Sequence, residues 1–266
     1  MNPPDKVVRV AERGRLVYYK QKADAGYWDG HWDKLIRPEF YDRALEGQLG
    51  QFEGLFTMYL PADERILEAG CGPAQWVIAL RQRSYNVEEV DWSKETIEKV
   101  NRIFPDLPIR CGNVCALEVE DGFYGAYISL GVVEHRAEGP EPFLSEAFRA
   151  LRPGGIAIVS VPWFNPLRRL KAWVGCFSVN DIIGMEFYQY AFRASEMKNY
   201  LTTVGFNVVE SKSSQNIKMG FEDELPFLDC IYRRGLFGRA LKRLVRRGRF
   251  TARYFGHMRT YVCRKP

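Results

Sequence analysis

The stretch RILEAGCGPA, residues 65–74, decides the fold of this chain. Residues 65–69 have the apolar content of a short buried strand, Gly70 and Gly72 form a GxG turn, and residues 76–83 have a helical pattern. Glycine adopts backbone conformations that other residues disfavour, and it lets a ligand approach the main chain closely. A strand, a glycine turn and a helix in this order predict a ligand site, although a purely structural turn has the same pattern.

Outward from this stretch, strands and helices alternate. Further strands are expected at residues 86–91, 109–110, 126–130, 156–161, 206–212 and 258–263, and helices at 93–104, 141–151 and 194–204. Such alternation is typical of right-handed crossovers between parallel strands. The chain is therefore predicted to be an α/β protein with a Rossmann-like, mostly parallel sheet of seven strands and helices on both faces.

Two acidic residues indicate the charge of the ligand. Asp91 closes the second expected strand, where a carboxylate can accept both hydroxyls of a ribose. Glu68 stands two positions before the first glycine, and its charge suits a ligand with an ammonium and a sulfonium rather than a pyrophosphate. The dinucleotide pattern GxGxxG would also need a glycine where Gln75 stands. These residues favour S-adenosylmethionine over NAD, and a nicotinamide-dependent oxidoreductase is the disfavoured rival.

Several motifs between residues 60 and 210 resemble those of class I S-adenosylmethionine-dependent methyltransferases, in the same order. They are EAGCG at 68–72, VDWS at 90–93, CGNV at 111–114, SLGVVEH at 129–135 and ALRPGG at 150–155. The last two are similar to the small-molecule subgroup that includes quinone-biosynthesis methyltransferases. The resemblance implies transfer of a methyl group from S-adenosylmethionine to a small-molecule acceptor.

The same resemblance implies the residues that bind the methionine part of the cofactor. Gly70 and Gly72 would lie against it, and Glu68 would be near its amino group. Leu130 and Gly131, which leave the fourth strand, would present backbone carbonyls to the ammonium.

For the nucleoside part, the resemblance implies that Asp91 holds the ribose hydroxyls and that Trp92 packs on the adenine. Asn113 would meet the adenine amino group with its side-chain oxygen, and Val114 would cover the ring. The family more often has aspartate where Asn113 stands and glycine where Ala74 stands. Asn113 keeps an acceptor and Ala74 adds one methyl group, so the expected binding mode is retained.

His135 is the candidate general base, because its ordinary pKa is suitable and it follows the fourth strand. A histidine that only packs and caps a helix start is the alternative. Some relatives hold a metal ion through Glu-x-x-Glu-His at this turn, but Gly131 stands in the place of the first glutamate. No metal site is therefore expected.

Residues 1–60 are expected to be an N-terminal helical lid segment, and residues 61–266 the methyltransferase domain, with insertions at about 162–190 and 213–256. Residues 31–60 have a helical pattern, and an aromatic cluster precedes and begins it: Tyr18, Tyr19, Tyr27, Trp28, His31 and Trp32. In relatives this segment folds over the cofactor, although a helical layer that packs on the sheet would have the same pattern. Both insertions are expected at the carboxyl edge of the sheet, bordering the acceptor site.

Charge is distributed unevenly. The formal net charge is +5, yet residues 230–266 contain twelve Lys and Arg and no Asp or Glu. Residues 233–250 combine these charges with apolar residues at helical spacing, which is typical of a helix on an anionic membrane surface. The acceptor is accordingly expected to be lipidic or anionic. A solvated charged face is the alternative, and nucleic acid is the less favoured partner.

The location expected from the sequence is cytoplasmic. The basic segment 233–250 adds the hypothesis that the protein attaches to the inner face of a membrane. Met1 to Leu16 lack the apolar core of an export signal, and six scattered cysteines without zinc spacing suggest reduced thiols. A non-catalytic S-adenosylmethionine-binding regulator or assembly factor, and a nucleic-acid or protein methyltransferase, remain alternative functions. The oligomeric state, the acceptor atom and the pathway stay open.

Overall fold

The computed structural model describes residues 7–21, 32, 35–70, 72–177, 182–213, 218–232, 235–247 and 249–266. Its main feature is a seven-stranded sheet with the order β5-β4-β3-β6-β7-β10-β9. The strands are β3 (Ile66–Ala69), β4 (Val87–Asp91), β5 (Ile109–Cys111), β6 (Tyr124–Leu130), β7 (Leu151–Pro162), β9 (Asn207–Ser213) and β10 (Met258–Arg264). Strand β10 runs antiparallel to the other strands of this sheet, which are parallel to one another. The predicted fold class and its strands are confirmed.

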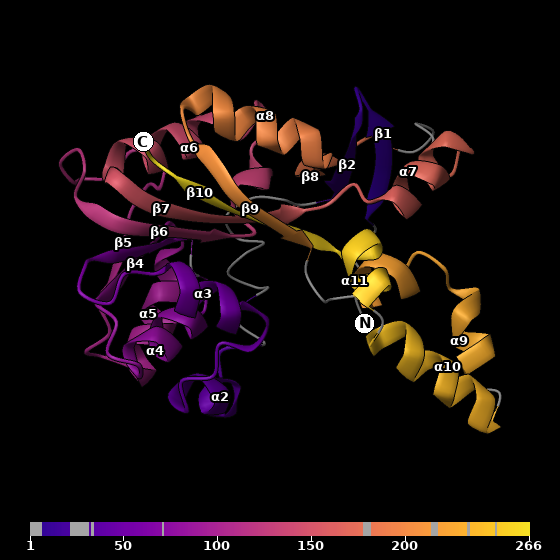
Figure 1. Cartoon of the computed structure of the whole chain (residues 1–266), viewed down its shortest axis with the longest axis horizontal. Coiled ribbons are helices and arrows are strands. Elements are labelled where there is room, and N and C mark those ends of the chain that lie inside the picture. Colours follow the sequence, from indigo (N-terminus) through magenta and orange to yellow (C-terminus); the bar gives the residue numbers. More distant parts are fainter. Residues whose placement is uncertain are drawn as a thin grey trace.

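Helices cover both faces of this sheet. They are α2 (Asp42–Leu45), α3 (Glu53–Tyr59), α4 (Gln75–Arg81), α5 (Lys94–Ile103), α6 (Glu141–Ala150) and α8 (Ala194–Val204), with 3-10 turns at Pro38–Tyr41, Gly50–Phe52 and Val133–His135. Figure 1 shows α3, α4 and α5 on one face and α6 and α8 on the other. Ser93 caps α5 as expected, since its hydroxyl accepts the Thr96 N–H at 3.0 Å.

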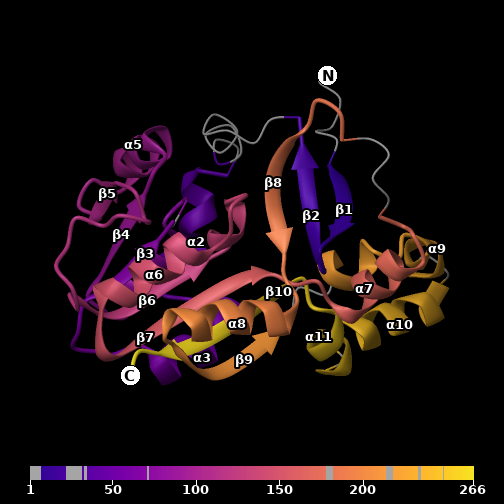
Figure 2. The same cartoon turned by 90° about the horizontal axis from the view of Figure 1, so that it is seen from above.

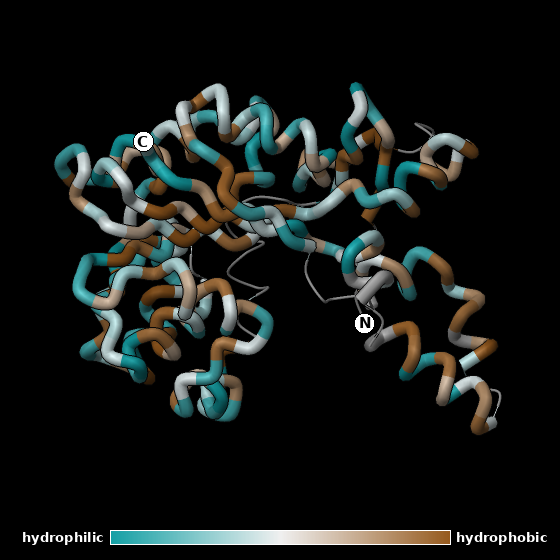
Figure 3. The backbone as a smooth tube through the Cα atoms, in the orientation of Figure 1, coloured by the Kyte–Doolittle hydropathy of each residue, from teal (hydrophilic) through white to brown (hydrophobic). Residues whose placement is uncertain are grey.

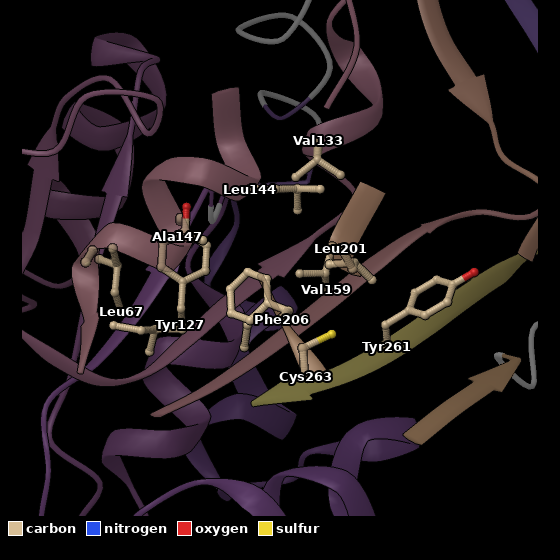
Figure 4. Packing of buried hydrophobic residues seen from close by; sticks show 14 of the residues in the cluster. Leu67, Tyr127, Val133, Leu144, Ala147, Val159, Leu201, Phe206, Tyr261 and Cys263 are labelled. Atoms are coloured by element: carbon tan, nitrogen blue, oxygen red, sulfur yellow. The ribbon is translucent and has the colours of Figure 1, made fainter. Parts of the chain in front are cut away.

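Each face of the sheet has its own apolar core. Because successive side chains of a strand point to opposite faces, Ile66 packs in one buried cluster and its neighbour Leu67 in the other. Figure 4 shows the second cluster, in which Tyr127, Phe206 and Tyr261 lie between the sheet and the helices above it. These cores hold the carboxyl ends of the parallel strands in fixed positions.

The N-terminal segment differs from the expected helical lid. Strands β1 (Val8–Glu12) and β2 (Arg15–Lys20) form a hairpin. Strand β8 (Glu186–Ala191) pairs with β2, which makes a second sheet of three strands. The turn residues Arg13 and Gly14 have φ of 45° and 87°, as a two-residue hairpin requires. The helical elements with described bounds in this segment follow the hairpin, from Pro38 onward. The expected aromatic residues Tyr27, Trp28 and His31 lie outside the described residues.

The two insertions are more regular than their sequences indicate. The first contains α7 (Pro166–Trp173) as well as β8, and the second contains a π-helical turn (Lys218–Glu222), α9 (Phe227–Tyr232), α10 (Gly235–Arg247) and α11 (Arg249–Phe255). Figures 1 and 2 place these elements and the hairpin together at one end of the large sheet, the end from which β7 leads toward β8. This is the carboxyl edge, as expected.

A buried ionic cluster joins the hairpin and the two insertions. The Glu224 carboxylate, which is 2% exposed, pairs with Arg9 of β1, with Arg168 Nε at 3.0 Å and with Lys171 Nζ at 2.8 Å. Arg168 also donates to Nδ1 of His257, just before β10, at 2.8 Å. Burial alone would raise the pKa of Glu224, but these cations outweigh it and hold that pKa below its usual range. One carboxylate thus fixes segments that are far apart in sequence.

Candidate functional site

A cavity of about 570 Å³ lies beyond the carboxyl ends of four neighbouring strands, β3, β4, β5 and β6. Its walls come from the residues that follow each strand, with Trp32 and Phe143 added from elsewhere. Eight of the sequence-predicted site residues line it: Gly70, Gly72, Asp91, Trp92, Asn113, Val114, Gly131 and His135. The structure therefore brings together residues that are spread over more than sixty positions of the sequence.

The glycine turn after β3 cannot carry side chains. Gly70 and Gly72 have φ of 77° and 55°, and a Cβ on Gly70 would lie 2.5 Å from Cγ2 of Val132. A Cβ on Gly72 would lie 2.9 Å from the Trp32 ring. Ala74 also has a positive φ, 62°, a conformation that favours glycine. Cys71 lies outside the described residues.

Asp91 is held at the cavity by two backbone hydrogen bonds. Its carboxylate accepts the Gly72 N–H at 2.9 Å and the Ser93 N–H at 2.9 Å, and the side chain is buried. The carboxylate therefore connects the end of β4 to the glycine turn after β3. Each carboxylate oxygen has two lone pairs, so acceptor capacity is left for a ligand hydroxyl.

Glu68 lies on β3, behind the cavity wall rather than on it. The side chain is 2% exposed, and its Oε2 has no hydrogen-bond partner among the described residues. Burial raises its pKa to about 8, Asp91 adds to this effect, and the N–H of Val77 opposes it. A nearby cation would favour the ionised form of Glu68.

The residues that follow β4 and β5 add an indole ring, an amide and an apolar side chain to the cavity lining. Trp92 is 57% exposed and faces the cavity, while Val114 is partly buried and packs against the main core. Asn113 Oδ1 accepts the Cys115 N–H at 2.9 Å, which fixes the loop after β5. That oxygen keeps one lone pair for a further donor.

Gly131, which directly follows β6, also lines the cavity. Gly131 has a φ of 76°, and its N–H donates to the Ser160 carbonyl at 2.8 Å. Leu130, the last residue of β6, packs against an apolar core and does not line the cavity. Among the expected cofactor residues, Glu68 and Leu130 are the two behind the wall.

His135 is oriented by the small sheet. Its Nδ1 lies 2.8 Å from the Tyr188 carbonyl, which can only accept, so the neutral ring carries its proton on Nδ1 and its lone pair on Nε2. Burial and the charge of Lys20 lower the pKa of His135, and the hydrogen bond to Tyr188 raises it. The net result is a pKa of about 4. The imidazole is therefore neutral at pH 7.

Sequence reasoning missed the residues that surround His135 from distant segments. Tyr188 of β8 packs edge-on against the imidazole, and Lys20 Nζ of β2 lies 3.6 Å from the centre of the Tyr188 ring. Buried Glu134, whose pKa burial raises to about 8, has Oε1 3.9 Å from His135 Nε2. Nothing local to residues 18–20 or 186–191 indicates this contact, because it depends on the pairing of β2 with β8.

In the part of the chain that the structure describes, no group of three or more His, Cys, Asp or Glu side chains could hold a metal ion. In the same residues, no helix is long and apolar enough to cross a membrane. The cysteines described at 111, 115, 176, 230 and 263 are all free thiols.

Comparisons with known proteins find methyltransferases among the similar sequences. Residues 67–159 match a family model described as a methyltransferase domain. A probable S-adenosylmethionine-dependent methyltransferase of Mycolicibacterium smegmatis is 30% identical over 153 residues, which are 56% of this chain and 54% of that protein. The chain thus spans about half the length of this curated relative.

Solved structures resemble the fold at low identity. A chain from a complex that contains the Haloferax volcanii methyltransferase activator Trm112 gives a TM-score of 0.58 at 18% identity, covering 91% of this chain and 95% of that one. The [4+2]-cyclase SpnF gives 0.52 at 18% identity, covering 80% and 79%. The match over residues 67–159 and the curated relative support a class I S-adenosylmethionine-dependent methyltransferase domain in that part of the chain.

Proposed function

We propose that the chain transfers a methyl group from S-adenosylmethionine to a small-molecule acceptor of lipidic or anionic character. The observation that carries the proposal is the single cavity in which a glycine turn, a backbone-anchored carboxylate and an exposed indole ring meet. A cavity of this size is typical of sites for small ligands. The polar groups are few and placed at its ends, which suits a ligand with a ribose and a charged amino-acid part.

The residues present fit that cofactor. Asp91 would accept the ribose hydroxyls, Trp92 and Val114 would enclose the adenine, and Asn113 would accept from its amino group. Gly70 and Gly72 would let the methionine part approach the main chain. The buried, unpartnered Oε2 of Glu68 is an acceptor without a donor, which an ammonium or a bridging water would satisfy. Gly131 and Leu130 would supply carbonyl oxygens to the same ammonium.

The bound cofactor would supply the methyl group on a sulfonium that is already a good leaving group. The protein then needs mainly to align donor and acceptor, which contributes on the order of 7–11 kcal/mol. His135, with its lone pair on Nε2, would accept a proton from the acceptor. With a pKa near 4 it is a weak base, so it suits an acceptor group that is already acidic.

Turnover is the direct test. The purified chain is titrated calorimetrically with S-adenosylmethionine, S-adenosylhomocysteine and NAD, and then supplied with a panel of acidic and lipidic acceptors while S-adenosylhomocysteine is quantified. We expect micromolar binding of the first two ligands, no binding of NAD, and product formation with at least one acceptor. A preference for NAD would contradict the proposal. Tight cofactor binding without any turnover would favour the alternative of a non-catalytic regulator, since one fold can serve different functions.

We further propose that α10 attaches the protein to an anionic membrane. Its exposed apolar residues Leu236, Phe237 and Leu244 are 78%, 75% and 70% exposed, and Arg239 and Arg243 flank them. Figure 3 shows the hydrophobic and hydrophilic stretches along this helix. Basic residues near an anionic leaflet contribute roughly 1 kcal/mol each, and buried apolar side chains add to this. Nucleic acid is the less favoured partner, because no Asn/Asp-Pro-Pro-Tyr motif follows the fourth strand.

Flotation with liposomes tests the membrane proposal. The chain is expected to float with vesicles that contain phosphatidylserine at low salt and to be released at high salt. Replacing Leu236, Phe237 and Leu244 by serine is expected to reduce the bound fraction at least fivefold. Leu45→Ser with Met58→Ser, two exposed apolar residues elsewhere, is the matched control. Equal flotation of the triple variant and the control would end this proposal.

A further inference from the structure

A second cavity, of about 580 Å³, lies between the β1–β2 hairpin, α7 and the start of α8. It shares no lining residue with the cavity described above. Three arginines, Arg15, Arg169 and Arg193, stand in its wall beside apolar side chains, and none of its described lining residues is acidic. Figures 1 and 2 show α7 beside the hairpin, with strands β3, β4, β5 and β6 farther away.

The positive charge of this cavity is only partly balanced. Arg15 pairs with Glu196 at 2.5 Å and donates to Tyr200 at 2.7 Å, while its buried Nε has no partner among the described residues. The side chains of Arg169 and Arg193 have no acidic partner in the same part of the chain. The guanidinium of Arg193 lies over the hairpin turn, where a Cβ on Gly14 would be 3.5 Å from its Cζ. Two guanidinium groups are therefore available to an anion.

The apolar part of the cavity is directed outward. Buried Phe164 forms part of its lining, and Leu170 and Trp173 of α7 are 55% and 83% exposed at its edge. Exposed apolar side chains gathered beside a charged site are typical of a binding surface. Guanidinium groups bind phosphate oxygens through paired hydrogen bonds, which makes arginine the preferred residue for this anion.

We propose that this cavity binds the phosphate group of an amphiphilic ligand, with Arg169 and Arg193 on the phosphate and Leu170 and Trp173 against the apolar chain. The proposal concerns a site separate from methyl transfer and does not depend on it. A neutral apolar ligand would leave the guanidinium groups unpaired, and a small inorganic anion would leave the indole exposed. The combination of charge and apolar surface therefore selects a ligand with both parts.

Binding is measured with dihexanoyl phosphatidic acid below its micellar concentration, with inorganic phosphate, and with dihexanoyl phosphatidylcholine, by calorimetry and tryptophan fluorescence. We expect the phosphatidic acid to bind most tightly and to change the fluorescence. Arg169→Gln with Arg193→Gln should weaken that binding at least tenfold, and Trp173→Phe should remove the fluorescence change. Arg43→Gln with Arg102→Gln, two exposed arginines on α2 and α5, is the matched control.

The thermal midpoint of each variant is measured alongside, and a value within a few degrees of wild type shows that the fold is retained. Unchanged phosphatidic acid binding by a folded double variant would overturn the site, as would no binding by the wild type. Phosphatidylcholine binding as tight as phosphatidic acid binding would show that the arginines do not select the ligand. Inorganic phosphate binding as tightly as the phosphatidic acid would overturn the amphiphilic ligand.

Discussion

Asp91→Ala is expected to weaken S-adenosylmethionine binding by about 100-fold or more. The carboxylate accepts the Gly72 and Ser93 N–H groups, so its removal frees the glycine turn as well as the proposed ribose contacts. A hydrogen bond to a charged group contributes about 1.5–3 kcal/mol, and two lost ribose bonds thus correspond to at least ~3 kcal/mol. Since about 1.4 kcal/mol is tenfold in affinity, the loss is about two orders of magnitude.

Calorimetric titration of the folded variant with S-adenosylmethionine and S-adenosylhomocysteine measures this loss. Both ligands carry the ribose, so both affinities should fall by a similar factor. Asp91→Asn keeps one oxygen acceptor and is expected to lie between wild type and alanine. Asp106→Ala removes an exposed carboxylate outside the cavity and should bind like wild type. An Asp91→Ala affinity within threefold of wild type would show that the carboxylate does not hold the ribose.

Glu224→Ala is expected to lower the free energy of unfolding by about 3–5 kcal/mol, because it leaves a buried charge without its partner. Arg168, which is 2% exposed, would keep its cation at the junction of α7, the π-helical turn and β10. For a chain of this length, that change corresponds to a thermal midpoint lower by about 10 °C. Hydrogen exchange should show faster opening of β1 and α7 than of β3 and β6.

Denaturant unfolding of two further variants separates charge from packing. Glu98→Ala breaks an exposed pair with Lys94 at 3.9 Å and should cost less than ~1 kcal/mol. Glu224→Leu with Arg168→Leu removes both buried charges and should recover part of the stability. Because the folded pKa of Glu224 is lowered, its contribution is present above the usual carboxyl pKa near 4.5 and is lost as the pH falls below it. Wild type and Glu224→Ala should therefore converge in acid; a constant difference would contradict this account.

That the expected residues would lie close together was largely predictable, because the cavity is built from strand ends. A parallel sheet brings the carboxyl ends of its strands to one edge, so motifs that follow β3, β4, β5 and β6 meet whatever the loops between them contain. Asp91 and the glycine turn are examples, and their backbone hydrogen bond joins residues only 19 positions apart. Glu68 and Leu130 lie inside strands and do not line the cavity, and their expected contacts with the ammonium stay a prediction.

The surroundings of His135 were not predictable from the sequence. His135 was identified from its own motif, but its tautomer comes from Tyr188, and its low pKa comes from burial and, to a lesser degree, from the charge of Lys20. The N-terminal segment was expected to be helical because residues 31–60 have a helical pattern, whereas residues 8–20 form strands. The hairpin pairs with β8, more than 160 residues away along the chain. No pattern within either segment specifies such a pairing.

The sequence alone determined the α/β class, the seven strands, the glycine turn and the acidic residue that faces it, because each follows from local periodicity and spacing. The tertiary structure alone decided which segments lie beyond the sheet: the small sheet against His135, the buried Arg168–Glu224 pair and the arginine-lined second cavity. Local patterns fix the faces that a segment buries, since burial follows from side-chain alternation. They do not fix its partner, because several segments offer equivalent faces and only the packing of the whole chain selects one.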